Sequence, residues 1–471
     1  DIGFEKEIWK AADKMRGNID ASEYKSVVLG LIFLKYISDK FEAKYQQLVA
    51  EGEGFEEDKD EYLSNKNEKG SYDPVFYVPA EARWEAIAIH AHSPEIGTII
   101  DNAMRAIEKE NKRLKDILPK NFARPELDKR RLGEVVDLFT NIRMHEHGDS
   151  KDILGRAYEY CLSKFAEAEG KLAGEFYTPA CIVKTLVNVL QPYKGRVYDP
   201  CCGSGGMFVQ SIKFIENHHG NKKEISIYGQ EYTATTYKLA KMNLAIRGIS
   251  ANLGDVAADT FGKDQHPDLK ADYIMANPPF NQKDWRAADE LKDDPRWRGY
   301  DVPPTSNANY AWILNMVSKL SENGVAGFIL ANGALSGGGE EYKIRRKLIE
   351  NDLVEAIVIL PRSMFYTTDI SVTLWILNKN KKSRTVQFPD ETRNYRDRQN
   401  EILFLDLREK GIPFEKKFTQ FSEDNIFEIT QAYHNWQTDL SIYEDVPEFC
   451  YAAKINEVIA KDFSLEIGRA H

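Results

Sequence analysis

The sequence has few cysteines and no long hydrophobic run. Its five cysteines form no C-x-x-C pair, and an odd number argues against a disulfide framework. The nearest approach to a membrane span, VVLGLIFLKYI at 27–37, is shorter than the roughly 18 residues such a span requires. The first residues, DIGFEKEIWK, lack the apolar core of a signal peptide. These absences argue against a membrane protein and favour a reduced, cytoplasmic one.

An excess of positive charge is also missing. The chain has 63 basic and 74 acidic residues and a net charge of −11, so as a whole it would be repelled by nucleic acid at long range. A function on DNA therefore requires basic surface that is local or that a partner supplies.

Clusters of metal ligands are missing as well. Two histidine pairs, HAH at 90–92 and HEH at 145–147, have no cysteine or further ligand beside them. We therefore expect no metal site.

The length of 471 residues exceeds one typical domain. Residues 1–150 are predicted to form a helical domain, because segments such as FEKEIWKAADKM at 4–15 carry an apolar stripe at helical spacing. Residues 151–385 are predicted to form an α/β domain, and residues 386–471 a C-terminal extension with a strand and helices that contacts partners.

Strands and helices alternate from about residue 170 onward, which predicts a mostly parallel, doubly wound, Rossmann-like sheet. The helix from residue 309 is expected to stop at Gly324, and the last helices are expected from residues 424 and 447. In such sheets, ligands bind at the carboxyl ends of the strands. The predicted strands are RVYD (196–199), ISIYGQ (225–230), ADYIMA (271–276), VAGFILA (325–331), VEAIVILP (354–361), SVTLWILN (371–378) and EILFLDL (401–407).

A glycine-rich loop, DPCCGSGGMF at 199–208, follows the first of these strands. A phosphate-binding P-loop would need a lysine after the glycines, and none is present. A dinucleotide fingerprint would need a third glycine where Phe208 stands. This departure weakens the case for a dinucleotide site. A turn without a ligand and an S-adenosylmethionine site are the other interpretations.

The order of the acids favours S-adenosylmethionine. Asp199 beside the loop could bind the ammonium of its amino-acid end, and Glu231 after the next strand could bind the two ribose hydroxyls. Asp255 could accept from the adenine ring. Any one of these acids alone would more often be a solvated loop carboxylate; their succession behind consecutive strands supports the cofactor site.

The tetrapeptide NPPF at 277–280 directly follows the strand ADYIMA. One interpretation of this tetrapeptide is a rigid turn that only ends the strand. As a clamp for adenine, the Asn277 oxygen and a proline carbonyl would accept the two amine hydrogens and expose the nitrogen lone pair, while Phe280 stacks on the base. The polar segment 281–306 beside it is long enough to suggest a function, such as closing over a base flipped out of the duplex.

The sequence resembles the modification subunit of type I restriction–modification systems, an adenine-specific DNA methyltransferase. GEFYTP (174–179), DPCCGSGGMF, YGQE (228–231), NPPF and NANYAWI (307–313) follow the pattern of that family in order. Cys201, Cys202 and Ser204 stand where the family often has other small residues. The family's chain usually continues beyond the point where this sequence ends, so a tail that contacts partners is expected to be missing.

The resemblance implies roles for specific residues. Thr178 would cap a helix beginning at Pro179. The residues implied to hold the cofactor are Glu175, Phe176, Tyr177, Thr178, Pro179, Ala180, Asp199, Gly203, Ser204, Gly205, Gly206, Glu231 and Asp255. Those implied to hold the target base are Asn277, Pro278, Pro279 and Phe280.

The resemblance also implies partners: double-stranded DNA, a specificity subunit held between two copies of this chain, and a restriction and translocation subunit. Two alternatives are a protein-glutamine methyltransferase, which can use a similar Asn-Pro-Pro-aromatic turn, and a non-catalytic adaptor that kept the fold. The long helical N-terminal region argues against the first alternative. The presence of both Glu231 and Asn277 in their motifs argues against the second.

Overall fold

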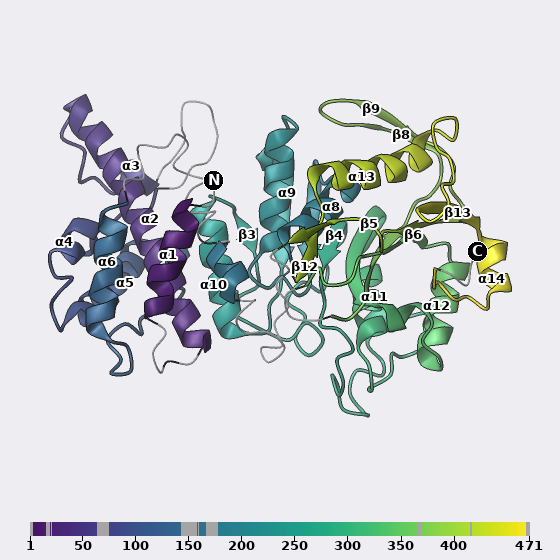
Figure 1. Cartoon of the computed structure of the whole chain (residues 1–471), viewed down its shortest axis with the longest axis horizontal. Helices are drawn as coiled ribbons and strands as arrows, with labels where there is room; N and C mark the ends of the chain where they lie inside the picture. The colour runs from purple at the N-terminus through teal and green to yellow at the C-terminus, as the bar shows by residue number, and fades with distance from the viewer. Residues whose placement is uncertain are drawn as a thin grey trace. The chain divides into compact units, whose positions relative to one another are not determined.

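The computed structural model describes residues 3–15, 19, 21–63, 75–142, 158, 160–165, 178–365, 369–414 and 417–467. Two compact units make up the chain (Figure 1). Unit 1 comprises residues 1–169 and 234–250, and unit 2 comprises residues 170–233 and 251–471. None of the described helices is long and apolar enough to cross a membrane.

Unit 1 is helical, as the sequence predicts: its described residues form helices and no strand. The apolar run 27–34 of α2 is buried on every side, which marks a central helix. Residues 234–250, which the sequence places in the α/β domain, pack here, since Tyr36 of α2 donates to the Ile246 carbonyl at 2.5 Å. The principal helices are α1 (Gly3–Lys14), α2 (Ala21–Glu51), α3 (Asp60–Leu63), α4 (Trp84–Ala88), α5 (Ile96–Glu110), α6 (Lys129–Thr140) and α10 (Ala234–Ile246).

Unit 2 contains a nine-stranded sheet, in the order β13-β10-β6-β7-β5-β4-β1-β2-β3. The run from β3 to β5 is parallel throughout, and β7 enters antiparallel to both its neighbours. This confirms the predicted α/β class with a mostly parallel sheet. The strands are β1 (Gly195–Asp199), β2 (Ile225–Gly229), β3 (Ala251–Asn252), β4 (Ala271–Ala276), β5 (Leu320–Ala331), β6 (Val354–Ile359), β7 (Val372–Asn378), β10 (Glu401–Asp406) and β13 (Cys450–Lys454).

Helices cover both faces of this sheet. In Figure 1, α8, α9 and α13 lie along one face and α11 and α12 along the other. Central strands such as β7 are buried along their whole length, as expected for a sheet covered on both sides. The helices are α8 (Ala180–Leu190), α9 (Gly206–Asn217), α11 (Asn309–Ser318), α12 (Glu340–Glu350), α13 (Glu423–Thr438) and α14 (Ile455–Ala460), and two small hairpins are β8–β9 (Arg384–Gln387, Thr392–Tyr395) and β11–β12 (Ile412–Phe414, Phe418–Gln420).

Two predicted element boundaries are wrong. Gly324 does not end a helix: α11 stops at Ser318 and the chain enters β5 at Leu320. A Cβ on Gly324 would lie 2.7 Å from the Ala271 carbonyl oxygen, so glycine is needed there for close approach to β4. The helix expected from residue 447 begins only at Ile455, because the preceding residues pair with β10 as β13.

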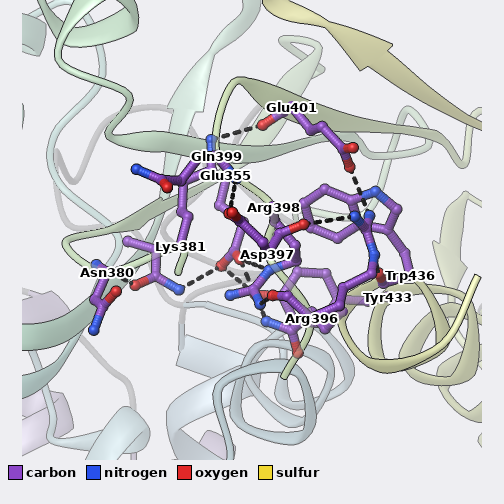
Figure 2. Close-up of polar contacts among 12 residues, drawn as sticks. Glu355, Asn380, Lys381, Arg396, Asp397, Arg398, Gln399, Glu401, Tyr433 and Trp436 are labelled. Atoms are coloured by element: carbon purple, nitrogen blue, oxygen red, sulfur yellow. Dashed lines mark hydrogen bonds and ion pairs between the residues drawn. The ribbon is translucent and has the colours of Figure 1, made fainter. Parts of the chain in front are cut away.

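The region after residue 386 is tied into the sheet by a buried ionic network (Figure 2). Glu355 of β6 accepts from Arg398 at 2.9 Å, from Tyr433 of α13 at 2.8 Å and from Asn378 of β7 at 2.9 Å. Burial alone would raise the pKa of Glu355, but the Arg398 charge and these hydrogen bonds lower it overall, so the carboxylate is ionised. β10 and β13, which follow Arg398 in the chain, extend the central sheet at one edge.

Candidate active site

The glycine-rich turn leaves the carboxyl end of β1, where it leads into α9. Gly203 and Gly205 have positive φ values of 53° and 82°, which glycine adopts without strain. The Gly205 amide donates to the Cys202 carbonyl at 2.8 Å and closes the turn. A Cβ on Gly203 or Gly206 would meet nothing within 4 Å, so the turn presents open backbone.

Glu231 links this turn to the end of β2. Its Oε2 accepts from the Gly203 amide at 3.0 Å, and its Oε1 accepts from the Thr233 amide at 2.9 Å. Each carboxylate oxygen can accept a further hydrogen bond. The carboxylate is therefore held in place by two backbone amides.

Asp199 lies at the base of the turn and is 2% exposed. One of its oxygens accepts from the Cys201 amide at 3.0 Å. Burial, together with the nearby negative charge of Glu231, raises the pKa of Asp199 to about 7. Such a carboxyl favours a positively charged partner, which would return it to the ionised state.

Asp255 lies beyond the end of β3 with an exposed side chain. Its amide donates to the Gln265 side chain at 2.9 Å. The loop that carries it is fastened to β2 by buried Gln230, which donates to the carbonyls of Ala258 at 3.1 Å and Lys263 at 2.7 Å. The loop after β3 thus places the Asp255 carboxylate.

Two exposed apolar residues next to these acids received no role from the sequence. Tyr232 follows Glu231 and is 74% exposed, and Val256 follows Asp255 and is 46% exposed. The sequence does place an apolar residue directly after each acid. This is a weak indication of a binding site, because single exposed apolar residues are common on protein surfaces.

The NPPF turn follows β4, the neighbour of β1 in the sheet. Asn277 Nδ2 donates to Thr178 Oγ1 at 2.8 Å. Asn277 Oδ1 is buried and has no hydrogen-bond partner among the described residues. Leaving a buried acceptor unpaired costs about 1–3 kcal/mol. A donor from outside the described residues could form a hydrogen bond with this oxygen.

Thr178 does not cap a helix, contrary to the sequence-based expectation. The N-cap of α8 is Pro179, without a side-chain capping bond, and the helix begins at Ala180. The Thr178 hydroxyl instead accepts a hydrogen bond from the side chain of Asn277, which lies 99 positions later in the sequence. Glu175, Phe176 and Tyr177 lie outside the described residues.

Phe280, at the end of the NPPF turn, packs edge-to-face against Phe365, with ring centroids 6.0 Å apart and an interplanar angle of 82°. Phe365 is buried and lies beyond the end of β6. Phe365 received no role in the sequence analysis, although PRSMF at 361–365 directly follows a strand.

The segment 281–306 is packed against the rest of unit 2. Trp285 donates to the Pro304 carbonyl at 2.8 Å, and its ring lies 4.7 Å from that of Phe261. Buried Arg296 donates to the carbonyls of Thr260 and Phe261 at 2.8 and 2.7 Å. The segment, which directly follows the NPPF turn, therefore has a defined structure and contacts the loop after β3.

The described residues contain no group of three or more His, Cys, Asp and Glu side chains placed to hold a metal ion. His92 Nε2 lies 3.1 Å from an Asp137 carboxylate oxygen, and the HEH segment at 145–147 lies outside the described residues.

Comparison with known proteins identifies the family. A family model described as N-6 DNA Methylase matches residues 149–471, and one described as HsdM N-terminal domain matches residues 4–139. The chain is 42% identical to the type I restriction enzyme HindI methylase subunit of Haemophilus influenzae, over 83% of this chain and 89% of that protein. It is 37% identical to the MjaIX methylase subunit of Methanocaldococcus jannaschii, over 99% of this chain and 83% of that protein.

The fold agrees with a solved structure. The type I restriction–modification methyltransferase subunit from Streptococcus thermophilus aligns with a TM-score of 0.80 at 24% identity, over 99% of this chain and 98% of that chain. The chain therefore belongs to the family of methylase subunits of type I restriction–modification systems, which are N6-adenine DNA methyltransferases.

Proposed function

We propose that this chain transfers a methyl group from S-adenosylmethionine to the exocyclic amine of adenine in double-stranded DNA, and that the NPPF turn carries the reaction. The observation that supports this assignment most directly is the buried, unpartnered Asn277 Oδ1. It lies in the turn that follows β4, adjacent in the sheet to the strand that carries the glycine-rich turn.

The residues around the glycine-rich turn fit S-adenosylmethionine. The open backbone from Gly203 to Gly206 would hold its amino-acid end, and Asp199 would receive the ammonium group. Glu231 would accept from the ribose hydroxyls, because each of its oxygens is already oriented by one backbone amide. Ser204 and Gly205 belong to the same turn.

Further residues would hold the adenine ring of the cofactor. Asp255 would accept from its amine, while the exposed apolar side chains of Tyr232 and Val256 would contact its faces. Residues 175–180 are proposed to line the same site. The cofactor, when bound, supplies a methyl group on a positively charged sulfur.

The NPPF turn would act on the target base. Asn277 Oδ1 and the Pro278 carbonyl accept the two amine hydrogens, which draws the nitrogen lone pair out of conjugation with the ring. Pro279 keeps the turn rigid, and Phe280 stacks on the base. The exposed lone pair would accept the methyl group that the bound cofactor supplies, leaving the cofactor's sulfur neutral, and the amine would lose one proton to solvent. A stacked adenine cannot reach this position, so the base must leave the duplex.

Target recognition is proposed to come from partners. With a net charge of −11 and no recognised DNA-reading motif in its sequence, the chain requires another source of base contacts and phosphate contacts. We propose a specificity subunit bound between two copies of this chain, and a restriction subunit in the complete assembly. Residues 1–150 and 386–471, which contain none of the proposed catalytic residues, are the proposed contact surfaces.

The test measures transfer of labelled methyl groups to duplex DNA by the chain with and without its specificity subunit, with a glutamine-containing protein as competing acceptor. Digestion of the DNA and mass spectrometry should locate the label on adenine N6. Label on protein alone, or on cytosine, would overturn the proposal.

A further inference from the structure

The exit of the NPPF turn is held by three asparagines. Asn281, directly after Phe280, has a positive φ of 51°. Its amide donates to Asn309 Oδ1 at 3.0 Å, and its own Oδ1 accepts from Asn309 Nδ2 at 2.9 Å. Asn307 Nδ2 also donates to that oxygen, at 3.2 Å. One side-chain amide, that of Asn309, thus contacts both the backbone and the side chain of Asn281.

Asn309 is itself fixed. It is 1% exposed and is the first residue of α11, and its amide donates to Asn307 Oδ1 at 2.8 Å. The Ala308 amide donates to the Gln282 carbonyl at 2.9 Å. Residues 281–282 and 307–309 therefore form the closed neck of the segment 281–306, attached to the start of a buried helix.

This neck determines how the chain leaves Phe280. The left-handed backbone conformation is disfavoured for residues other than glycine. Asparagine tolerates it when its side chain forms local hydrogen bonds. The bonds from Asn309 stabilise that conformation at Asn281. The ring of Phe280 itself packs edge-to-face against Phe365.

We propose that Asn309 is a positioning residue for methyl transfer: its side-chain amide fixes the exit of the NPPF turn and thereby the place of the Phe280 ring against the target base. The inference rests on the proposed function of that turn. Asn309 does not contact the base; it acts through Asn281 and Phe280.

The test compares Asn309→Ala with a matched variant, Asn378→Ala, in the complex with the specificity subunit. Asn378 is also buried and also donates from its side chain, but to Glu355 in the network of Figure 2. Misplacement of a substrate-orienting group by about 1 Å can cost about 100-fold in rate. For Asn309→Ala we expect kcat to fall about tenfold to 100-fold, with unchanged affinity for S-adenosylmethionine; Asn378→Ala should lower thermal stability but not kcat.

Two further measurements separate positioning from loss of stability. With 2-aminopurine at the target position, Asn309→Ala should give a smaller fluorescence change on binding than the parent, because the extrahelical base is held less well. Adding Asn281→Gly should restore part of kcat, since glycine adopts the left-handed conformation without side-chain bonds.

Equal kcat values for Asn309→Ala and Asn378→Ala would overturn the inference, and so would a further loss on adding Asn281→Gly. If the parent complex transfers no methyl group to DNA, the proposed function fails and the inference fails with it. An active parent with an unaffected Asn309→Ala variant contradicts the inference alone.

Discussion

With Asp199 as the proposed acceptor of the ammonium group, S-adenosylmethionine binding should depend on pH near neutrality. Its pKa is about 7 in the free protein because the carboxyl is buried beside Glu231. The ionised form is the one that attracts an ammonium group, and a bound cation lowers the pKa. With that pKa, about one tenth of the carboxyl is ionised at pH 6 and about nine tenths at pH 8. The association constant for S-adenosylmethionine should therefore rise about tenfold between these pH values.

The assay is isothermal titration calorimetry at pH 6, 7 and 8, with Asp199→Asn as the control. The amino group of the ligand also titrates, so the informative quantity is the difference between parent and variant. Asp199→Asn should bind more weakly at pH 8 and should show only the pH dependence of the ligand. An affinity of the parent that changes with pH no more than that of Asp199→Asn would refute the reasoning.

The same residue has the opposite effect on stability. The pKa of Asp199 is higher in the folded chain than the ordinary value of 3.8 for an aspartate, so the folded state binds the proton more strongly. The free energy of unfolding therefore decreases as pH rises from about 4 to about 7, and the penalty is fully present above pH 7. Without ligand, Asp199→Asn should be more stable than the parent at pH 8, by at most about 4 kcal/mol, which thermal unfolding would measure.

The remaining predictions concern the ribose site and the buried network. Glu231→Ala removes a charged acceptor worth about 1.5–3 kcal/mol per hydrogen bond, so calorimetry should show S-adenosylmethionine binding weakened by at least tenfold; affinity equal to that of the parent would exclude Glu231 from the site. Arg398→Ala removes the cation that is paired with buried Glu355 and should cost about 3–5 kcal/mol, seen as a lower denaturation midpoint in urea. A midpoint within error of the parent would show that the ion pair does not support the sheet.

Local patterns predicted the parts of the fold that depend on neighbouring residues. β1, β2 and β4 lie where their apolar runs indicated, and the glycine-rich turn and NPPF follow β1 and β4 as expected. Parallel strands place their carboxyl ends at one edge, so these motifs could be assigned to one site from the sequence. Direct contact between Gly203 and Glu231, 28 positions apart, agrees with that assignment.

Features that depend on distant residues could not be predicted in this way. Gly324 resembled a helix stop, but its place in β5 is decided by pairing with β4. The region after residue 386 read as an extension, although β10 and β13 join the central sheet through partners far away in the sequence. Thr178 and Asn277, Phe280 and Phe365, and the neck around Asn309 are likewise contacts that no local period reveals.

The claim that the NPPF turn carries methyl transfer is tested most directly by Asn277→Ala. Cells that express the chain with its specificity subunit provide DNA in which N6-methyladenine can be quantified by mass spectrometry after digestion. The parent should produce N6-methyladenine, while Asn277→Ala should produce almost none. The purified variant should still bind S-adenosylmethionine with the affinity of the parent, because the proposed role of the unpaired Asn277 Oδ1 is to act on the target amine. The same level of N6-methyladenine from Asn277→Ala as from the parent would contradict the account.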